Sequence, residues 1–233
     1  MKHAFTLRLF ALILSLPLVF VSCQKDDDDT PTPSTPGSGG GSGNAIGTPP
    51  QTFTKKVMLE YHTAAWCGTC VDALAKRDQV MSSFPDKVIP VEIHQSDGMQ
   101  KPIFFTIDAT FGSNTALGMV NRTASTSSVL LNRTQWLSNT SVLLNQTASC
   151  GLAITSKMDG PVAKLEVQAA FNQTLSGPHN ITVYLLEKSI KGTGPSYDQV
   201  NSYNGDPTSP YYNLGNPIVG FEHEYVLNRA ITN

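Results

Sequence analysis

The residues best suited to chemistry are two cysteines, Cys67 and Cys70, in the sequence WCGTC that begins at Trp66. Two residues separate the thiols, and a helical pattern begins directly after them. A cysteine at the start of a helix faces unpaired N–H groups and the positive end of the helix dipole, and both favour thiolate over thiol. We therefore predict a dithiol/disulfide redox pair in which Cys67 is the nucleophile, Cys70 releases mixed disulfides and Trp66 shields one side.

Other interpretations of the cysteine pair stay open. It could be a structural disulfide, or half of a metal site completed by His62 and His94, which end two expected strands. These spacings match no familiar zinc pattern, so neither a metal nor another cofactor is expected. Glu60 precedes the motif on its strand. It could accept a proton beneath the dithiol, or it could be a partly buried acid on an edge.

The elements that must position this pair alternate between strands and helices. Hydrophobic periodicity predicts strands at 55–62, 86–94, 117–122 and 125–131 and helices at 70–84, 101–112 and 132–148. The resulting order β-α-β-α-β-β-α is typical of an α/β thioredoxin-like domain, which we place at residues 53–148. In that fold a dithiol lies between the first strand and its helix.

The third strand of this domain departs from the thioredoxin-like pattern. Oxidoreductases of this fold carry a cis-proline just before that strand, but the chain has no proline between Pro102 and Pro161. Leu117, preceded by Ala116, occupies the equivalent position. A cis bond before a residue other than proline costs about 2.5–4 kcal/mol, so we expect a trans bond and a differently shaped loop. The missing cis-proline therefore argues against full thiol-disulfide oxidoreductase activity.

The N-terminus predicts export. Lys2 and Arg8 precede an apolar run that is too short to cross a bilayer and suits a signal peptide, here residues 1–22. The run ends at Ser22-Cys23, which is similar to a lipobox, so we expect Cys23 to carry the lipid. The alternative is a plain secretory peptide followed by an incidental cysteine.

Residues 23–52 begin with acidic residues and continue with Pro, Thr, Gly and Ser, so we expect a disordered tether. Lys25, Asp26 and Asp27 resemble the signal that sends some lipoproteins of Gram-negative bacteria to the cell surface. A solvated charge run is the alternative. We expect a protein anchored by lipid in the cell outer membrane and facing outwards.

Residues 149–233 change to alternating strand patterns with turn signals, and we expect a small all-β second domain. Cys150 opens its first strand and is expected to be a buried small hydrophobe rather than a third redox thiol. The net charge is −2, and basic residues are scattered rather than interleaved with aromatic ones, so nucleic acid is not expected as a partner.

The chain resembles the lipoprotein family named after a 28-kilodalton outer-membrane protein in the segments VMLEYHTAAWCGTC, DKVIPVEIH, GMVNR, VYLLEKSI and HEYVLNRA. The resemblance implies a thioredoxin-like domain followed by an immunoglobulin-like β domain. Relatives commonly have Gly-x-Pro-Thr at residues 115–118 and continue with further strands, so the β domain is expected to be truncated or reduced. The resemblance also implies an envelope protein that binds or adheres to an extracellular protein or peptide. A membrane-tethered oxidoreductase is the alternative.

Overall fold

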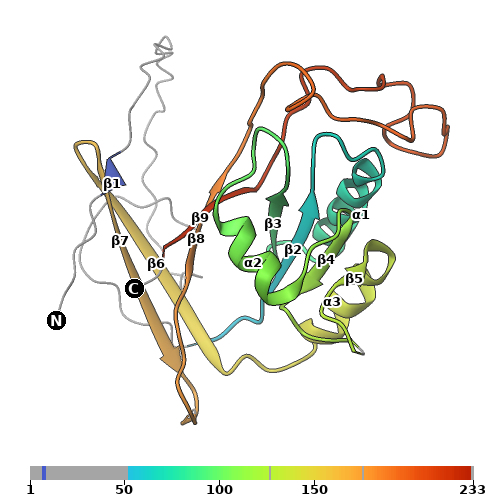
Figure 1. Ribbon diagram of the computed structural model, residues 1–233. Helices are drawn as coiled ribbons and strands as arrows, with labels where there is room; N and C mark the ends of the chain where they lie inside the picture. Colours follow the sequence, from blue (N-terminus) through green and yellow to red (C-terminus); the bar gives the residue numbers. More distant parts are fainter. Residues whose placement is uncertain (1–6, 9–51, 126, 175, 232–233) are drawn as a thin grey trace, which may run out of the picture. The chain divides into compact units, whose positions relative to one another are not determined.

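The computed structural model describes residues 7–8, 52–125, 127–174 and 176–231 (Figure 1). The chain divides into two compact units. The α/β unit comprises residues 54–148 and 175–233, and the hairpin unit comprises residues 1–53 and 149–174. The expected lipid-attachment residue Cys23 and the expected export signal at residues 25–27 lie outside the described residues.

The α/β unit is built on a six-stranded sheet with the order β5-β4-β2-β3-β9-β8. Its strands are β2 (Val57–Thr63), β3 (Val88–His94), β4 (Leu117–Val120), β5 (Leu131–Asn132), β8 (Val183–Glu187) and β9 (Val226–Ile231). The central pair β2 and β3 is parallel along its whole length, and β9 is parallel to β3 through the pair Glu92 and Val226. β4 and β8 run antiparallel to their neighbours β2 and β9.

Helices cover both faces of this sheet (Figure 1). The helices are α1 (Cys70–Ser83), α2 (Ile103–Phe111), the short 3₁₀ helix η1 (Arg133–Gln135) and α3 (Trp136–Leu144). α1 and α3 pack on one face, where Leu74 and Trp136 meet the β2 residues Leu59 and Tyr61. α2 packs on the other face through Phe104. Successive side chains of a strand point to opposite faces, so β2 supplies residues to both cores.

The expected element order is present, and the α/β unit is consistent with a thioredoxin-like fold. Of the described residues in the strand expected at 125–131, only Leu131 lies in a strand, β5, and the helix expected at 132–148 is the shorter α3, preceded by η1. The immunoglobulin-like domain is not confirmed. β8 and β9 extend the six-stranded sheet, whereas β6 and β7 belong to a separate three-stranded sheet. A period-two pattern identifies a strand but not its partners, and here β9 pairs with the distant β3 as well as with β8.

The hairpin unit contains a long antiparallel pair, β6 (Cys150–Asp159) and β7 (Val162–Phe171), with β1 (Leu7–Arg8) paired to the start of β7. Cys150 is a free, half-buried thiol at the start of β6. Alternate residues of the hairpin place exposed apolar side chains on one face: Leu152, Ile154, Met158 and Leu165. Among the described residues, no helix is both long and apolar enough to span a membrane.

Candidate functional site

Cys67 and Cys70 lie between β2 and α1, where the sequence predicts them, and they form a disulfide with a Cα–Cα distance of 5.4 Å. Cys70 is the first residue of α1, and its N–H donates to the Cys67 carbonyl. Cys67 is only 5% exposed and Cys70 is fully buried. The disulfide therefore belongs to the core beneath α1 and α3 rather than to an open surface.

Trp66 is the accessible part of the motif. Its side chain is 45% exposed, and its indole Nε1 donates a hydrogen bond to the Gln95 carbonyl at 3.1 Å. The ring is thereby fixed against the loop that follows β3. Trp66 directly precedes Cys67 and is therefore the exposed aromatic residue closest in sequence to the disulfide.

Gln199 holds the loop that carries the cysteines. It belongs to the connecting segment, residues 188–225, which joins β8 to β9. Its buried Nε2 atom donates to the carbonyls of Ala64 and Ala65 at 3.3 Å and to that of Cys67 at 3.0 Å. A single amide group thus ties three carbonyl oxygens before and at the first cysteine to the connecting segment.

The backbone of the connecting segment extends this contact. Val200 donates its N–H to the Ala65 carbonyl at 2.7 Å, and Ser202 donates its N–H to the Gly68 carbonyl at 3.0 Å. A Cβ atom on Gly68 would lie 2.1 Å from the Ser202 hydroxyl oxygen and 3.3 Å from the Ser202 N atom, so a larger residue would require Ser202 to rotate its side chain and shift. The chain therefore covers one side of its own disulfide loop with residues 199–202.

The position that corresponds to the cis-proline has a different geometry. The bond between Ala116 and Leu117 is trans, and among the described residues the cis bond lies elsewhere, at Asn216–Pro217. Ala116 has a φ of 64° and donates its N–H to the His62 carbonyl, while Leu117 donates its N–H to Asn114. Both N–H groups of this loop are therefore satisfied within the chain.

A buried ion pair lies on the α1 face of the sheet. Arg77 of α1 and the hydroxyl of Tyr61 on β2 both bond Oε1 of Glu92 on β3. Burial alone would raise the pKa of Glu92, but its contacts with His94 and Arg77 hold that pKa below its usual value. Burial also raises the pKa of Tyr61 well above its usual value. The carboxylate of Glu92 is therefore charged and the phenol is neutral.

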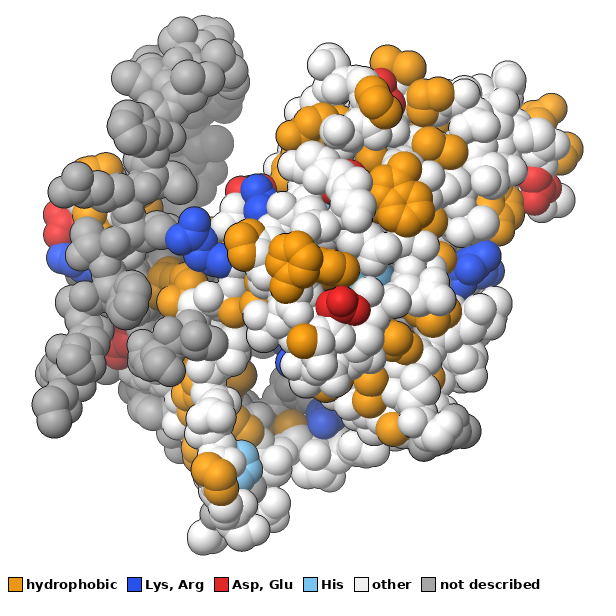
Figure 2. Space-filling view, viewed as in Figure 1, with side chains coloured by type: hydrophobic (Ala, Val, Ile, Leu, Met, Phe, Trp, Pro, Cys, Tyr) orange, Lys and Arg blue, Asp and Glu red, His pale blue; other side chains and the backbone are white. Residues whose placement is uncertain are grey.

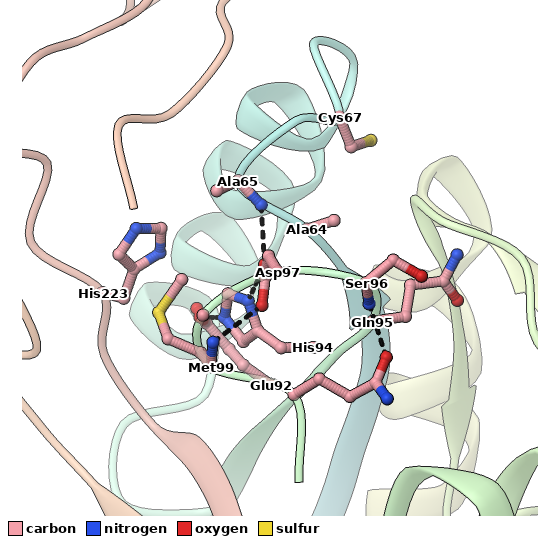
Figure 3. A network of polar contacts seen from close by, with 12 residues as sticks. Ala64, Ala65, Cys67, Glu92, His94, Gln95, Ser96, Asp97, Met99 and His223 are labelled. Carbon is pink, nitrogen blue, oxygen red and sulfur yellow. Dashed lines mark hydrogen bonds and ion pairs between the residues drawn. The ribbon is translucent and has the colours of Figure 1, made fainter. Parts of the chain in front are cut away.

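Asp97 connects this ion pair to the disulfide loop (Figure 3). Its Oδ2 atom accepts hydrogen bonds from Nδ1 of His94 at 2.7 Å and from the Ala65 N–H at 2.8 Å. Burial alone would lower the pKa of His94, but the hydrogen bonds to Asp97 and Glu92 raise it to about 9. Without a metal, His94 is thus a buried cation between two carboxylates.

His223 completes the cluster from the connecting segment. Its Nε2 atom donates to the Tyr197 carbonyl at 2.8 Å, and its ring meets that of His94 edge to face with the ring centres 5.3 Å apart. Burial lowers the pKa of His223. This imidazole is therefore neutral at pH 7, with its proton on Nε2 and a lone pair on Nδ1.

The structure separates Glu60 and His62 from the disulfide. Both side chains are fully buried on the α2 face of the sheet, the opposite face from Cys67. Glu60 forms two hydrogen bonds of 2.7 Å with Arg122, so its carboxylate has a partner and is not a partly buried edge acid. His62 packs against Phe104 and is not brought together with His94.

Four residues of the site were not expected from any motif in the sequence: Glu92, Asp97, Gln199 and His223. The spacing of Glu92 and His94 carries a usable signal, because residues two apart in a strand share a face. Gln199 and His223 come from a segment rich in Gly, Asn and Tyr, where periodicity gives no position.

No protein-family model and no curated protein matches the chain. Among solved structures, the chain is similar to HBP35 of Porphyromonas gingivalis, with a TM-score of 0.59 and 20% sequence identity over 78% of this chain. The match covers 58% of that protein, so this chain spans little more than half its length. A protein of Agrobacterium tumefaciens matches with a TM-score of 0.44 and 11% identity, covering 78% of this chain and 73% of that one. The first similarity supports the fold, and the second carries no argument.

Proposed function

We propose that this chain is a surface-exposed envelope lipoprotein that binds an extracellular protein or peptide, and that Cys67–Cys70 is a structural staple of its α/β unit. The observation that carries the staple is the burial of both cysteines under the hydrogen bonds of Gln199. Disulfide exchange requires access to a sulfur atom, and a buried pair fixed to a second segment offers little.

The loop at Ala116 supports the same proposal. In thioredoxin-like oxidoreductases the backbone beside the cis-proline pairs with the substrate peptide. Here the N–H of Ala116 donates to His62 and that of Leu117 donates to Asn114. A peptide substrate would find neither donor free, so the fold is better suited to hold the disulfide than to exchange it.

The reduction potential of the pair tests this proposal. A staple is expected to have a potential below about −300 mV, whereas thioredoxin lies near −270 mV and strong oxidants near −120 mV. Equilibration of the full chain with glutathione or dithiothreitol buffers, read by alkylation of free thiols, gives the value. A potential above about −270 mV would contradict the staple.

A membrane-tethered oxidoreductase is the second candidate, because WCGTC stands at the start of α1 and Trp66 is exposed beside it. Its test is the alkylation rate of reduced Cys67 against pH. A nucleophile at a helix N-terminus titrates below the roughly 8.5 of a free thiol, and a buried staple does not.

The binding role is supported by surface composition. The face shown in Figure 2 carries hydrophobic side chains over the α/β unit and only scattered Lys and Arg, which suits a protein partner better than nucleic acid. The hairpin unit adds the exposed apolar side chains of β6, including Leu152 and Ile154. Exposed apolar patches commonly mark interaction sites. Capture of surface proteins by the wild type but not by a variant with Leu152→Lys and Ile154→Lys would support this role.

The envelope anchor has its own test. Replacing Cys23 by Ser is expected to abolish labelling by radioactive fatty acid and to release the protein from membranes. Replacing Lys25, Asp26 and Asp27 by Ala is expected to leave labelling intact but to protect the protein from protease added to whole cells. Labelling of the Ser variant would contradict the anchor, and unchanged protease access would contradict the export signal.

A further inference from the structure

One buried cluster in the α/β unit gathers side chains that bind transition metals. Glu92 and His94 lie two residues apart on one face of β3, and His223 lies three residues before β9. The parallel pairing of β3 with β9, which includes a 2.9 Å bond from the Glu92 N–H to the Tyr225 carbonyl, brings His223 to this face. One ligand atom from each side chain lies within 4.8 Å of the other two.

Each of the three side chains has its remaining polar atom held by an outer partner, and Figure 3 shows that of His94, which is Asp97. Asp97 bonds Nδ1 of His94, and the Tyr197 carbonyl bonds Nε2 of His223. Tyr61 and Arg77 bond Oε1 of Glu92. Metal-binding histidines almost always donate their second nitrogen to a carboxylate or carbonyl in this way. The atoms left for a common ligand are Nε2 of His94, Nδ1 of His223 and Oε2 of Glu92.

We propose that Glu92, His94 and His223 bind one divalent transition-metal ion of the zinc class. Two imidazoles and one carboxylate form a donor set of zinc sites that keep a fourth position for water or another ligand. Bonds of about 2.0–2.2 Å around a tetrahedral ion place ligand atoms about 3.4 Å apart. Nε2 of His94 and Oε2 of Glu92 are already 3.4 Å apart, so the adjustment falls mainly on His223.

Binding would exchange a proton for the ion. The metal takes the position of the proton that His94 shares with Oε2 of Glu92, and that proton leaves to solvent. The ion then cross-links β3 to the connecting segment through His223. Asp97 accepts hydrogen bonds from both His94 and the Ala65 N–H, so holding His94 in place also holds the loop before Cys67 in place. The proposed site does not depend on the proposed role of the disulfide.

Cobalt titration of the wild type tests the site directly. The probe is Co²⁺ added to the metal-free, oxidised full chain in detergent, prepared without a polyhistidine tag. We expect one Co²⁺ per chain, visible ligand-field bands of a four- or five-coordinate ion, no thiolate charge-transfer band, and displacement by Zn²⁺. The melting temperature should rise with added Zn²⁺. Absence of saturable binding, or a thiolate band, would overturn the proposal.

Variants locate the ion. His223→Gln can keep a donor to the Tyr197 carbonyl but loses the imidazole, and we expect at least 100-fold weaker Co²⁺ affinity. Asp97→Asn is expected to weaken affinity about 10–100-fold, the usual effect of losing an outer partner. His179→Gln, at an exposed histidine, is the matched control and should bind as the wild type. Unchanged affinity in folded His223→Gln would overturn the site. If that variant does not fold, X-ray absorption of the zinc-loaded wild type decides, because fewer than two imidazole ligands would overturn it.

Discussion

Gln199 donates from its side-chain Nε2 to the carbonyl oxygen of Cys67 at 3.0 Å, although the two residues lie in segments far apart in sequence. The same nitrogen contacts the carbonyls of Ala64 and Ala65. The connecting segment is therefore part of the disulfide site, and its loss would free the loop from Ala64 to Cys67.

Gln199→Leu is expected to lower the free energy of unfolding by about 1–3 kcal/mol, because it leaves buried carbonyl groups without this donor. We also expect several-fold faster reduction of the disulfide by dithiothreitol, measured by alkylation of the released thiols. Gln146→Leu, at an exposed glutamine, is the control. Equal reduction rates in wild type and Gln199→Leu would show that the connecting segment does not protect the disulfide.

Leu117→Pro is expected to destabilise the protein by at least about 1 kcal/mol and to leave exchange activity unchanged. Proline removes the N–H that bonds the Asn114 carbonyl, and it disfavours the φ of 64° that Ala116 adopts. Urea denaturation measures the first effect and peptide disulfide exchange the second. Leu117→Ile, which keeps the N–H, is the control. A stable Leu117→Pro variant with increased exchange would instead favour the oxidoreductase.

His62 predicts a pH dependence of stability. Burial lowers its pKa to about 4 although Asp108 acts in the opposite direction, while the unfolded side chain titrates at its ordinary value of 6.5. Between these values the unfolded chain binds a proton that the folded chain does not, so stability falls as pH falls from 6.5 to 4. The loss reaches about 3 kcal/mol.

His62→Leu removes this titration and also two buried nitrogen atoms that form no hydrogen bond. We expect the stability difference between the wild type and His62→Leu to change in favour of the variant as the pH falls from 6.5 to 4. Chemical denaturation at several pH values gives the difference directly. His179→Leu, at an exposed histidine, is expected to show no such trend. A constant difference for His62→Leu would refute the assignment.

Breaking the ion pair of Glu60 and Arg122 is expected to destabilise the protein mainly because it leaves a buried charge without a partner, not because the attraction itself is strong. Arg122→Leu leaves the fully buried Glu60 carboxylate without its cation and should cost about 3 kcal/mol of unfolding free energy. Adding Glu60→Leu should recover most of that loss. Arg133→Leu breaks a more exposed pair with Asp72 and should cost about 1 kcal/mol or less. A double variant as unstable as Arg122→Leu would contradict this account.

Sequence reasoning located the parts of the fold that depend on local pattern. The β-α-β-α-β-β-α order follows from short-range periodicity, and Cys67 and Cys70 at the start of α1 follow from the motif. The pairing of β9 with β3 did not follow, because apolar alternation is the same whether a strand joins only its neighbours in sequence or also a distant strand.

The polar residues of the site were harder to predict for a related reason. Asp97 and Gln199 act through hydrogen bonds to backbone atoms of other segments, and such bonds leave no periodic trace in the sequence. Glu60 shows the opposite error. Its place on the strand was predicted correctly, but strand alternation puts it on the face opposite Leu59 and Tyr61, where its partner Arg122 follows β4.

The position of β9 between β3 and the edge strand β8 also constrains the order of folding. One edge of β3 stays open until β9 arrives and pairs with it through Val226 and Glu92, although β2, β3 and α1 are made much earlier. Long-range parallel pairing forms slowly, and an unpaired strand edge can template aggregation while it waits. In a nascent chain this edge of β3 is therefore exposed until β9, the last described strand, has been made.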